Sequence, residues 1–180
     1  QYTEFVIQAS SSCGGSGTWL FSHQTASTIY NFLKRDERYI VTPYIPHSVS
    51  VNIHSIIYEK EVVLLPPSVQ IISTENVNFS YNGGDFLSYR KLPQIIKDKV
   101  ASHAHMIGDK LRDKGYRGVC GIDFLITESD IYLMEINSRF QASTILINKA
   151  LTINSIPISV QLLHKDAFDN PNCSYNFSAF

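Results

Sequence analysis

The sequence has no excess of charge of either sign, and it has few cysteines. Of its 180 residues, 15 are Lys or Arg and 16 are Asp or Glu, which gives a net charge of −1. No basic block stands out, so we expect the chain to bind neither nucleic acid nor an anionic membrane surface. Three cysteines (Cys13, Cys120 and Cys173) are too few for a disulfide framework. Such cysteine usage is typical of a cytoplasmic protein.

The sequence also lacks an apolar run long enough to span a bilayer, and it shows no signal peptide. With 44% hydrophobic and 17% charged residues, its composition is that of a folded globular chain. It begins at Gln1 rather than at a methionine and enters a strand pattern at once. We therefore interpret it as a piece of a longer protein.

The first 45 residues alternate short apolar segments with runs of glycine, serine and proline. This pattern predicts strands over residues 4–9, 19–21 and 38–42, a loop over 10–18 and a helix over 25–34. Pro43 and Pro46 then mark a hinge. We predict a small lobe over residues 1–45 and a larger lobe over residues 46–180.

The middle of the chain predicts a pair of strands and then a long loop. Residues 49–55 alternate between apolar and polar side chains, which is the period of a half-buried strand. A turn over 59–61 leads into a return segment over 62–72, which two prolines interrupt. The polar stretch 73–92 predicts a long loop of the kind that often acts as a lid.

The strongest helix pattern covers residues 93–114, and Gly115 follows it as a stop. Its apolar residues recur at intervals of three and four: Ile96, Val100, Ala104, Ile107 and Leu111. Residues 119–126 and 131–136 then predict a hairpin with a polar turn at 128–130. A final helix is predicted over 155–163, with an irregular tail after Asp166.

The loop from Ser10 to Thr18 is a candidate phosphate-binding flap, because glycines let backbone N–H groups approach an anion closely. It has no Lys-Ser/Thr end, so it is not a P-loop. A strand rather than a helix is expected to follow, so it is not a dinucleotide-binding fingerprint either. A flexible hairpin without function is the alternative reading of this segment.

A second candidate site lies on the predicted hairpin. Residues two apart in a strand share a face, so Glu135, Asn137 and Arg139 point together, while Met134, Ile136 and Ser138 face the other side. Asp123 of the preceding strand lies opposite this polar row. Carboxylate and amide oxygens suit Mg²⁺, and a guanidinium suits a phosphoryl group. The alternative is a solvated face on an edge hairpin.

The early Gly/Ser loop and the late Asp…Glu-x-Asn-x-Arg set, formed by Asp123, Glu135, Asn137 and Arg139, resemble the ATP-grasp superfamily. The order of the predicted elements agrees with it over residues 4 to about 151. The resemblance implies an α+β fold of two lobes, with mostly antiparallel sheets and packed helices, that binds ATP.

The resemblance also assigns candidate site residues. Gly14, Gly15, Ser16 and Gly17 would close over the phosphates. The hinge residues Thr42, Pro43, Tyr44 and Ile45 would contact adenine. One or two Mg²⁺ ions, or Mn²⁺ in their place, would be bound by Asp123, Glu135 and Asn137. Arg139 would stabilise the transferred phosphoryl group, and Gln141, Ser143 and Thr144 are candidates to face the substrate.

Three features depart from the family pattern. Gln8 stands where many members have a lysine that reaches the phosphates. Residues 43–58 contain no acid that could hold the ribose. The N-terminal subdomain that completes the substrate pocket is missing from the sequence. These departures predict weak nucleotide binding by this chain alone.

The function that the resemblance implies is ATP- and Mg²⁺-dependent ligation. A small carboxylate substrate would be activated as an acyl phosphate and attacked by an amine or another nucleophile, forming a C–N or C–S bond. Two alternatives stay open: a non-catalytic nucleotide-binding module and an ATP-grasp kinase that stops after phosphorylation. The sequence specifies neither the acid, nor the nucleophile, nor the oligomeric state.

Overall fold

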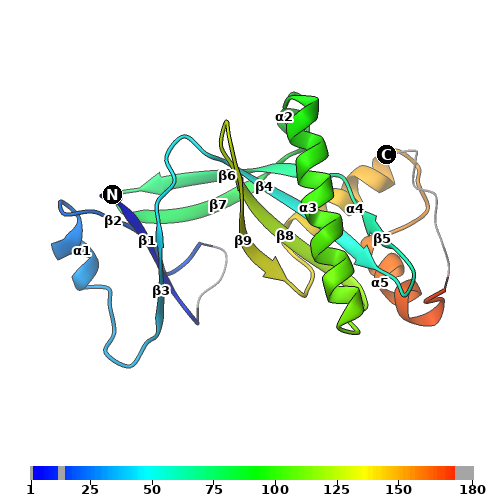
Figure 1. The fold of residues 1–180 in the computed structure, drawn as a ribbon, viewed down its shortest axis with the longest axis horizontal. Helices are drawn as coiled ribbons and strands as arrows, with labels where there is room; N and C mark the ends of the chain where they lie inside the picture. The colour runs from blue at the N-terminus through cyan, green and yellow to red at the C-terminus, as the bar shows by residue number, and fades with distance from the viewer. Residues whose placement is uncertain (1, 12–14, 173–180) are drawn as a thin grey trace. The chain divides into compact units, whose positions relative to one another are not determined.

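The computed structural model describes residues 2–11 and 15–172, which form two compact units (Figure 1). Unit 1 takes its described residues from 1–48 and 71–82, and unit 2 takes them from 49–70 and 83–180. Residues 71–82 are the tip of a long hairpin, so unit 1 is not one continuous stretch of chain. The division into functional lobes at residue 45 stays a prediction.

Unit 1 is a small antiparallel sheet with one short helix. Its elements from the N-terminus are β1 (Phe5–Ala9), β2 (Thr18–Phe21), α1 (Ala26–Tyr30) and β3 (Tyr39–Pro43). β1 is central, with β2 and β3 antiparallel on its two sides, and β2 also pairs with the hairpin tip at Trp19 and Asn78. The buried core consists of Ile7, Ala9, Trp19, Ile29 and Val77.

Helix α1 is shorter than the predicted 25–34. The N–H of Phe32 bonds to the carbonyl oxygen of Ile29 at 2.9 Å, three residues back, which tightens and ends the helix. The Phe32 ring then stacks on Trp19, with ring centroids 6.0 Å apart and planes 1° from parallel. This contact favours the turn over a further helical turn.

Unit 2 is built on antiparallel strands and several helices. Its elements, of which β6 and β7 extend into unit 1, are β4 (Val49–Ile57), β5 (Val62–Leu64), β6 (Ser68–Glu75), β7 (Asn78–Asp85), α2 (Phe86–Arg90), α3 (Gln94–Asp113), β8 (Gly118–Ile126), β9 (Ile131–Asn137), α4 (Ser143–Ile153) and α5 (Val160–Asp169). β4 pairs with β8 along its whole length, and β8 pairs with β9. On its other side, β4 pairs with β5 and with the start of β6.

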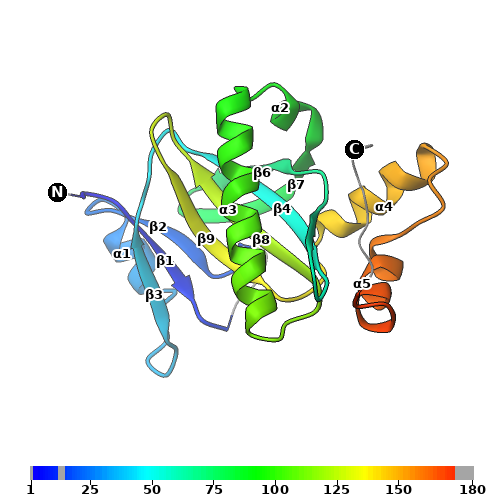
Figure 2. The ribbon, with the colours of Figure 1, turned by 45° about the vertical axis from the view of Figure 1, so that its right-hand side comes forward.

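The β4–β8 sheet is covered on both faces. Helix α3 lies along one face in both ribbon views (Figure 1 and Figure 2), where Val100 and Ala104 pack against Ile53 and Ile122. On the other face, α4 and α5 pack against Ile56 and Val119. Residues 51–57 are all buried, so the prediction of a half-buried strand is wrong. Asn52 and His54 of β4 are interior on the face that α4 covers, whereas Ser55 is buried on the opposite face.

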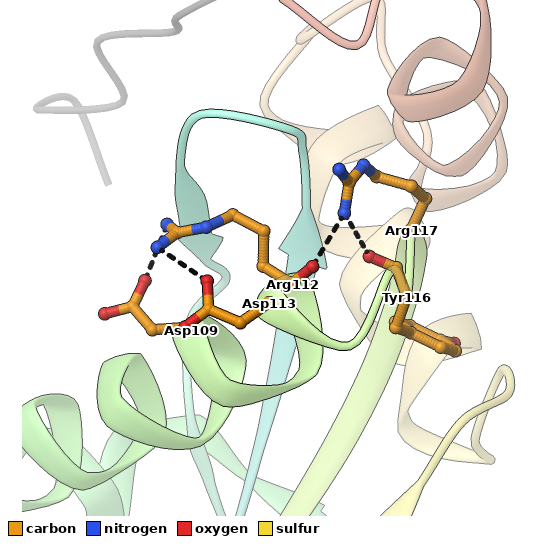
Figure 3. A network of polar contacts seen from close by, with 5 residues as sticks. All are labelled: Asp109, Arg112, Asp113, Tyr116 and Arg117. Carbon is orange, nitrogen blue, oxygen red and sulfur yellow. Dashed lines mark hydrogen bonds and ion pairs between the residues drawn. The ribbon is translucent and has the colours of Figure 1, made fainter.

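The predicted helix 93–114 and hairpin 119–136 are confirmed as α3 and as β8 with β9. The connection between them is tied by arginines (Figure 3). Arg112 pairs with Asp109 at 2.7 Å and with Asp113 at 3.6 Å. Arg117 donates to the carbonyl oxygens of Arg112 (3.2 Å) and Tyr116 (2.8 Å), which caps the end of the helix. The start of β8, and hence the site on it, is fixed to α3.

Two predicted segments are wrong. Residues 73–92 are not a loop, because they contain the end of β6, the β6–β7 turn, all of β7 and α2. Their side chains are largely exposed or half-buried, so backbone pairing rather than a buried face holds these strands. The predicted helix 155–163 is replaced by α4 and α5. Ser155 has a φ of +55°, which ends α4, and the Ser159 hydroxyl caps α5 by accepting from the Leu162 N–H at 3.2 Å.

Cys120 is buried, as predicted, while Cys13 and Cys173 lie outside the described residues. Over residues 2–11 and 15–172, no helix has the length and apolar character needed to cross a membrane.

Candidate metal and nucleotide site

The β8–β9 hairpin brings the predicted acidic pair together. Asp123 is the register partner of Glu135, and Gly121 is the partner of Asn137. The predicted position of Asp123 opposite Glu135 and Asn137 is therefore confirmed, whereas Arg139 lies two residues beyond the end of β9 and is not part of the strand face. Asp123 is half-buried, Asn137 is buried, and Glu135 and Arg139 are exposed.

A β-bulge separates this pair from the rest of the hairpin. The register shifts between Asp123 and Phe124, so Phe124 pairs with Leu133 rather than with Met134. Ile136 and Leu133 both line a groove of about 400 Å³ against α3. Ile136 therefore faces away from the acids as predicted, but Met134 is the extra residue of the bulge and Leu133 continues the apolar face.

Asp123 is surrounded by carboxamide groups from four other segments. Its Oδ1 accepts from Asn52 Nδ2 at 2.5 Å and from Gln70 Nε2 at 3.5 Å. Its Oδ2 accepts from Asn137 Nδ2 at 3.3 Å and from Gln141 Nε2 at 3.5 Å. Uncharged donors thus surround the carboxylate of Asp123, and its register partner on β9, Glu135, is also an acid.

The pKa of Asp123 is raised above its usual value, first because burial penalises the charged form. Hydrogen bonds from Asn52 and Gln141 oppose this shift, the charge of Glu135 adds to it, and the charge of Arg139 opposes it. A bound cation would favour the ionised form of the same carboxylate, because opposite charges stabilise each other at short range.

Arg139, the last residue of the predicted polar row, is not bonded to either acid. Arg139 donates from Nη1 to the carbonyl oxygen of Phe140 at 3.2 Å and makes no ion pair among the described residues. Its guanidinium is exposed and is not attached to Asp123 or Glu135. It is therefore available for an anionic ligand.

Gly121 makes room for Gln141. A Cβ at position 121 would overlap the Oε1 of Gln141, so only glycine lets that carboxamide lie against β8. From there Gln141 accepts from Asn52 at 2.8 Å and donates to Asp123. The glycine thus shapes the site through a neighbouring side chain, not through its own backbone freedom.

The predicted nucleotide-binding residues lie in unit 1. Gln8 pairs in register with Ile40 of β3, and Thr42 pairs with Val6. Because strand positions two apart share a face, Gln8 and Thr42 lie on the same face of the sheet, opposite the core residue Ile7. Pro43 is the register partner of Phe5. Tyr44 donates its N–H to Glu4 O at 3.0 Å, which ties the hinge to the start of the chain.

The described end of the glycine loop is a tight turn. Gly15 and Gly17 have φ values of +86° and +67°, and Thr18 N–H donates to Gly15 O at 3.1 Å. A Cβ at Gly15 would come within 2.9 Å of Phe79 O, so the loop crosses the backbone of β7 closely. Ser16 lies between the two glycines, and Gly14 lies outside the described residues.

The sequence analysis missed Asn52 and Gln70 and mentioned Gln141 and Ser143 only as possible substrate contacts. The signal for Asn52 was present, since Ser50, Asn52 and His54 alternate along β4. The alternation predicts a solvent-facing row, whereas Asn52 and His54 are buried beneath α4. His54 donates to or accepts from Thr144 Oγ1 at 2.9 Å in the same row.

The residues present fit Mg²⁺. Within the part of the chain that the structure describes, no three His, Cys, Asp or Glu side chains cluster, so the candidate donors are two carboxylates and an amide oxygen. Asn137 bonds to Asp123 through its Nδ2, which leaves its oxygen for a cation. Mg²⁺ is characteristically held by one or two carboxylates together with substrate oxygens.

Residues 1–143 match a family model described as the ATP-grasp domain (ATP-grasp_3). The chain belongs to the ATP-grasp family. The predicted fold class is thereby confirmed: an α+β protein with a mostly antiparallel sheet and packed helices.

Other ATP-grasp proteins agree with this assignment. A curated relative, the [butirosin acyl-carrier protein]–L-glutamate ligase of Niallia circulans, is 33% identical over 107 residues, which are 57% of this chain and 24% of the relative. N5-carboxyaminoimidazole synthetase of Staphylococcus aureus, solved with ADP, has a TM-score of 0.67 at 14% identity. The matched region is 95% of this chain and 42% of that protein. The biotin carboxylase domain of Hydrogenobacter thermophilus 2-oxoglutarate carboxylase, solved with MgADP, ADP and bicarbonate, has a TM-score of 0.66 at 14% identity and covers 96% and 38%.

This ATP-grasp chain spans about a quarter of the curated relative and about two fifths of these solved proteins. At such low identity the solved structures establish the fold.

Proposed function

We propose that this ATP-grasp chain provides the nucleotide- and magnesium-binding residues of a ligase that joins a carboxylate to an amine or another nucleophile. The observation that carries the proposal is the cross-strand pair Asp123–Glu135, with Asn137 beside it and neutral carboxamides around Asp123. Two facing carboxylates would repel each other, which is costly unless a cation lies between them. The curated relative, itself a ligase, supports the same class of reaction.

In unit 2, Asp123, Glu135 and Asn137 would hold one or two Mg²⁺ ions, or Mn²⁺ in their place. When bound, the metal neutralises charge on the phosphate oxygens and orients them for in-line transfer. Arg139, exposed two residues beyond the end of β9 and without a carboxylate partner among the described residues, would bind the transferred phosphoryl group. Its planar guanidinium suits two phosphoryl oxygens at once.

In unit 1, the turn of Gly15, Ser16 and Gly17 would bind phosphate oxygens with backbone N–H groups, together with Gly14. Thr42 to Ile45 would contact the adenine, and Gln8 would donate a hydrogen bond to phosphate from the position that is often lysine. A carboxamide binds phosphate more weakly than an ammonium group does, because it carries no charge. We therefore expect modest affinity for ATP.

The proposed reaction has two steps. A carboxylate oxygen of the acid attacks the γ-phosphorus of ATP, the bond from that phosphorus to the bridging oxygen breaks, and ADP leaves. The amine or other nucleophile then attacks the carbonyl carbon of the acyl phosphate, and inorganic phosphate leaves. L-Glutamate is the first acid to try, because the curated relative is a glutamate ligase.

The test is to incubate the full-length protein with Mg²⁺-ATP, L-glutamate and hydroxylamine. An acyl phosphate would be trapped as a hydroxamate with one ADP released for each one formed. We expect Asp123→Asn and Glu135→Gln each to abolish hydroxamate formation. Unchanged activity in both variants would contradict the metal assignment. If glutamate gives nothing, the same assay is run over a panel of amino, hydroxy and dicarboxylic acids.

The two alternatives give other outcomes. An ATP-grasp kinase that phosphorylates a hydroxyl group would release a stable phosphate ester and give no hydroxamate. A non-catalytic module, which Gln8 favours, would bind ATP in calorimetry but release no ADP with any acid and nucleophile. The protein would work inside the cell, where ATP is available.

A further inference from the structure

We propose that Asn52, a residue of β4, positions Asp123 for metal binding by anchoring one carboxylate oxygen and leaving the other for the ion. This inference rests on the proposed metal role of Asp123. It assigns Asn52 to the site as a positioning residue, since its side chain contacts Asp123 and not the reacting atoms.

The first step is the strength of the contact. Asn52 and Asp123 are register partners on β4 and β8, and Nδ2 lies 2.5 Å from Oδ1. The three other carboxamide contacts of Asp123 range from 3.3 to 3.5 Å. A hydrogen bond to an ionised acceptor strengthens as it shortens, so Asn52 contributes most to the orientation of this carboxylate.

The second step is the orientation of Asn52 itself. Its Oδ1 accepts from the Ser143 hydroxyl at 2.9 Å, and its Nδ2 donates to both Asp123 and Gln141. The flipped carboxamide would place an oxygen against Asp123 Oδ1 and Gln141 Oε1, so the network accepts only one orientation. Asn52 and Ser143 are each 3% exposed, which keeps water from replacing these contacts.

The third step is the difference in contacts between the two carboxylate oxygens of Asp123. Oδ1 receives the short bond from Asn52, whereas Oδ2 has only the longer contacts with Asn137 and Gln141. Oδ2 is thus the oxygen on the side of Asn137, a proposed ligand. Removal of a neighbour that orients a metal ligand in this way typically lowers metal affinity by roughly 10- to 100-fold.

The experiment measures Mn²⁺ binding to the full-length protein by the EPR signal of free Mn²⁺, with and without ADP, beside the thermal midpoint of unfolding. Asn52→Leu keeps the branched shape of the side chain but removes the donor. We expect it to raise the Mn²⁺ dissociation constant about tenfold or more. Ser143→Ala, which leaves Asn52 in place but frees its orientation, should raise it several-fold, and the double variant should match Asn52→Leu alone.

The matched control is Ser55→Ala. Ser55 is also buried on β4, but its hydroxyl bonds to Cys120 O at 3.3 Å on the opposite face of the sheet. It should lower the thermal midpoint without changing Mn²⁺ affinity. If Asn52→Leu does not fold, Asn52→Ser and Ser143→Ala test the same expectation.

The outcomes separate the inference from the proposed function. A dissociation constant within twofold of the parent protein for both Asn52→Leu and Ser143→Ala overturns the positioning role, and so do additive effects in the double variant. If Mn²⁺ binding is absent from the parent protein, or unaffected by Asp123→Asn, the proposed metal site is wrong and the inference falls with it.

Discussion

The side chain of Gln141 occupies the space that a Cβ would fill at Gly121. The carboxamide reaches Asp123 and Asn52 only because β8 has no side chain at that point. The identity of one residue on β8 therefore controls a residue that lies 20 positions further along the chain.

Gly121→Ala should damage the site while sparing the fold. Gln141 is flexible and its end can move aside, so we expect the free energy of unfolding to change by no more than about 1 kcal/mol. Loss of its contacts should weaken Mn²⁺ binding several-fold. The check is Mn²⁺ titration with urea unfolding, repeated in the Gln141→Ala background, where Gly121→Ala should have no further effect on metal binding. A full additional effect there would show that glycine acts by another route.

Arg139→Ala should lower the rate of the reaction without changing the stability of the fold. The guanidinium is exposed and bonds only to the neighbouring carbonyl oxygen of Phe140 in the described structure. Its removal should leave the thermal midpoint unchanged but lower kcat by about 100-fold, as loss of a group that stabilises transition-state charge does. ATP affinity should change far less than kcat. Arg117→Ala is the contrasting variant, because Arg117 ties α3 to β8 and should affect stability instead.

Gly15→Ala and Gly115→Ala form a matched pair. Both glycines have a φ near +85°, where an alanine costs roughly 1–2 kcal/mol. Gly115 has open space around it, whereas a Cβ at Gly15 meets the backbone of Phe79. Hydrogen exchange should show faster exchange of the Thr18 N–H in Gly15→Ala only, and KM for ATP should rise there only. Equal effects of the two variants on KM would argue against a role of the loop in binding ATP.

His54 should make the protein acid-sensitive. Burial lowers its pKa from 6.5 to about 4, so the folded state keeps the imidazole neutral while the unfolded state binds a proton below pH 6.5. Stability is therefore full above pH 6.5 and falls as the pH drops toward 4, by roughly 3 kcal/mol in total. Urea unfolding at pH 7, 6, 5 and 4 should show this loss, and His54→Gln should show a smaller one. Parallel curves for the two proteins would contradict the shift.

Several features were predictable from the sequence because one physical signal dominated each. Helix α3 has an uninterrupted apolar stripe, and the β8–β9 hairpin has two apolar runs around a polar turn. The turn alone would pair Asp123 with Met134, and the bulge at Met134 brings Glu135 to that position instead. Family resemblance then gave the fold class, which the match over residues 1–143 confirms.

Other features depended on tertiary context. Asn52 looks like a solvent-facing strand residue, and only the packing of Ser143 from a distant helix makes it part of a buried network. Strand β7 alternates between exposed and half-buried residues over 78–82, but none of its residues is fully buried. Helix α4 buries Ile147 and Leu151, four residues apart, but exposes Ile145 at 72%, so its apolar residues do not form a single stripe in the sequence.

The bulge at Met134 has a consequence for how this hairpin can evolve. Before it, Ile131 and Leu133 face α3, whereas after it Glu135 and Asn137 lie on the side of Asp123. A strand with strict alternation would place all four side chains on one face. Removing a single residue there would thus place Ile131 and Leu133 on the face of Asp123, or would turn Glu135 and Asn137 away from it. Across related proteins, we expect the number of residues between Asp123 and Glu135 to vary less than their identity.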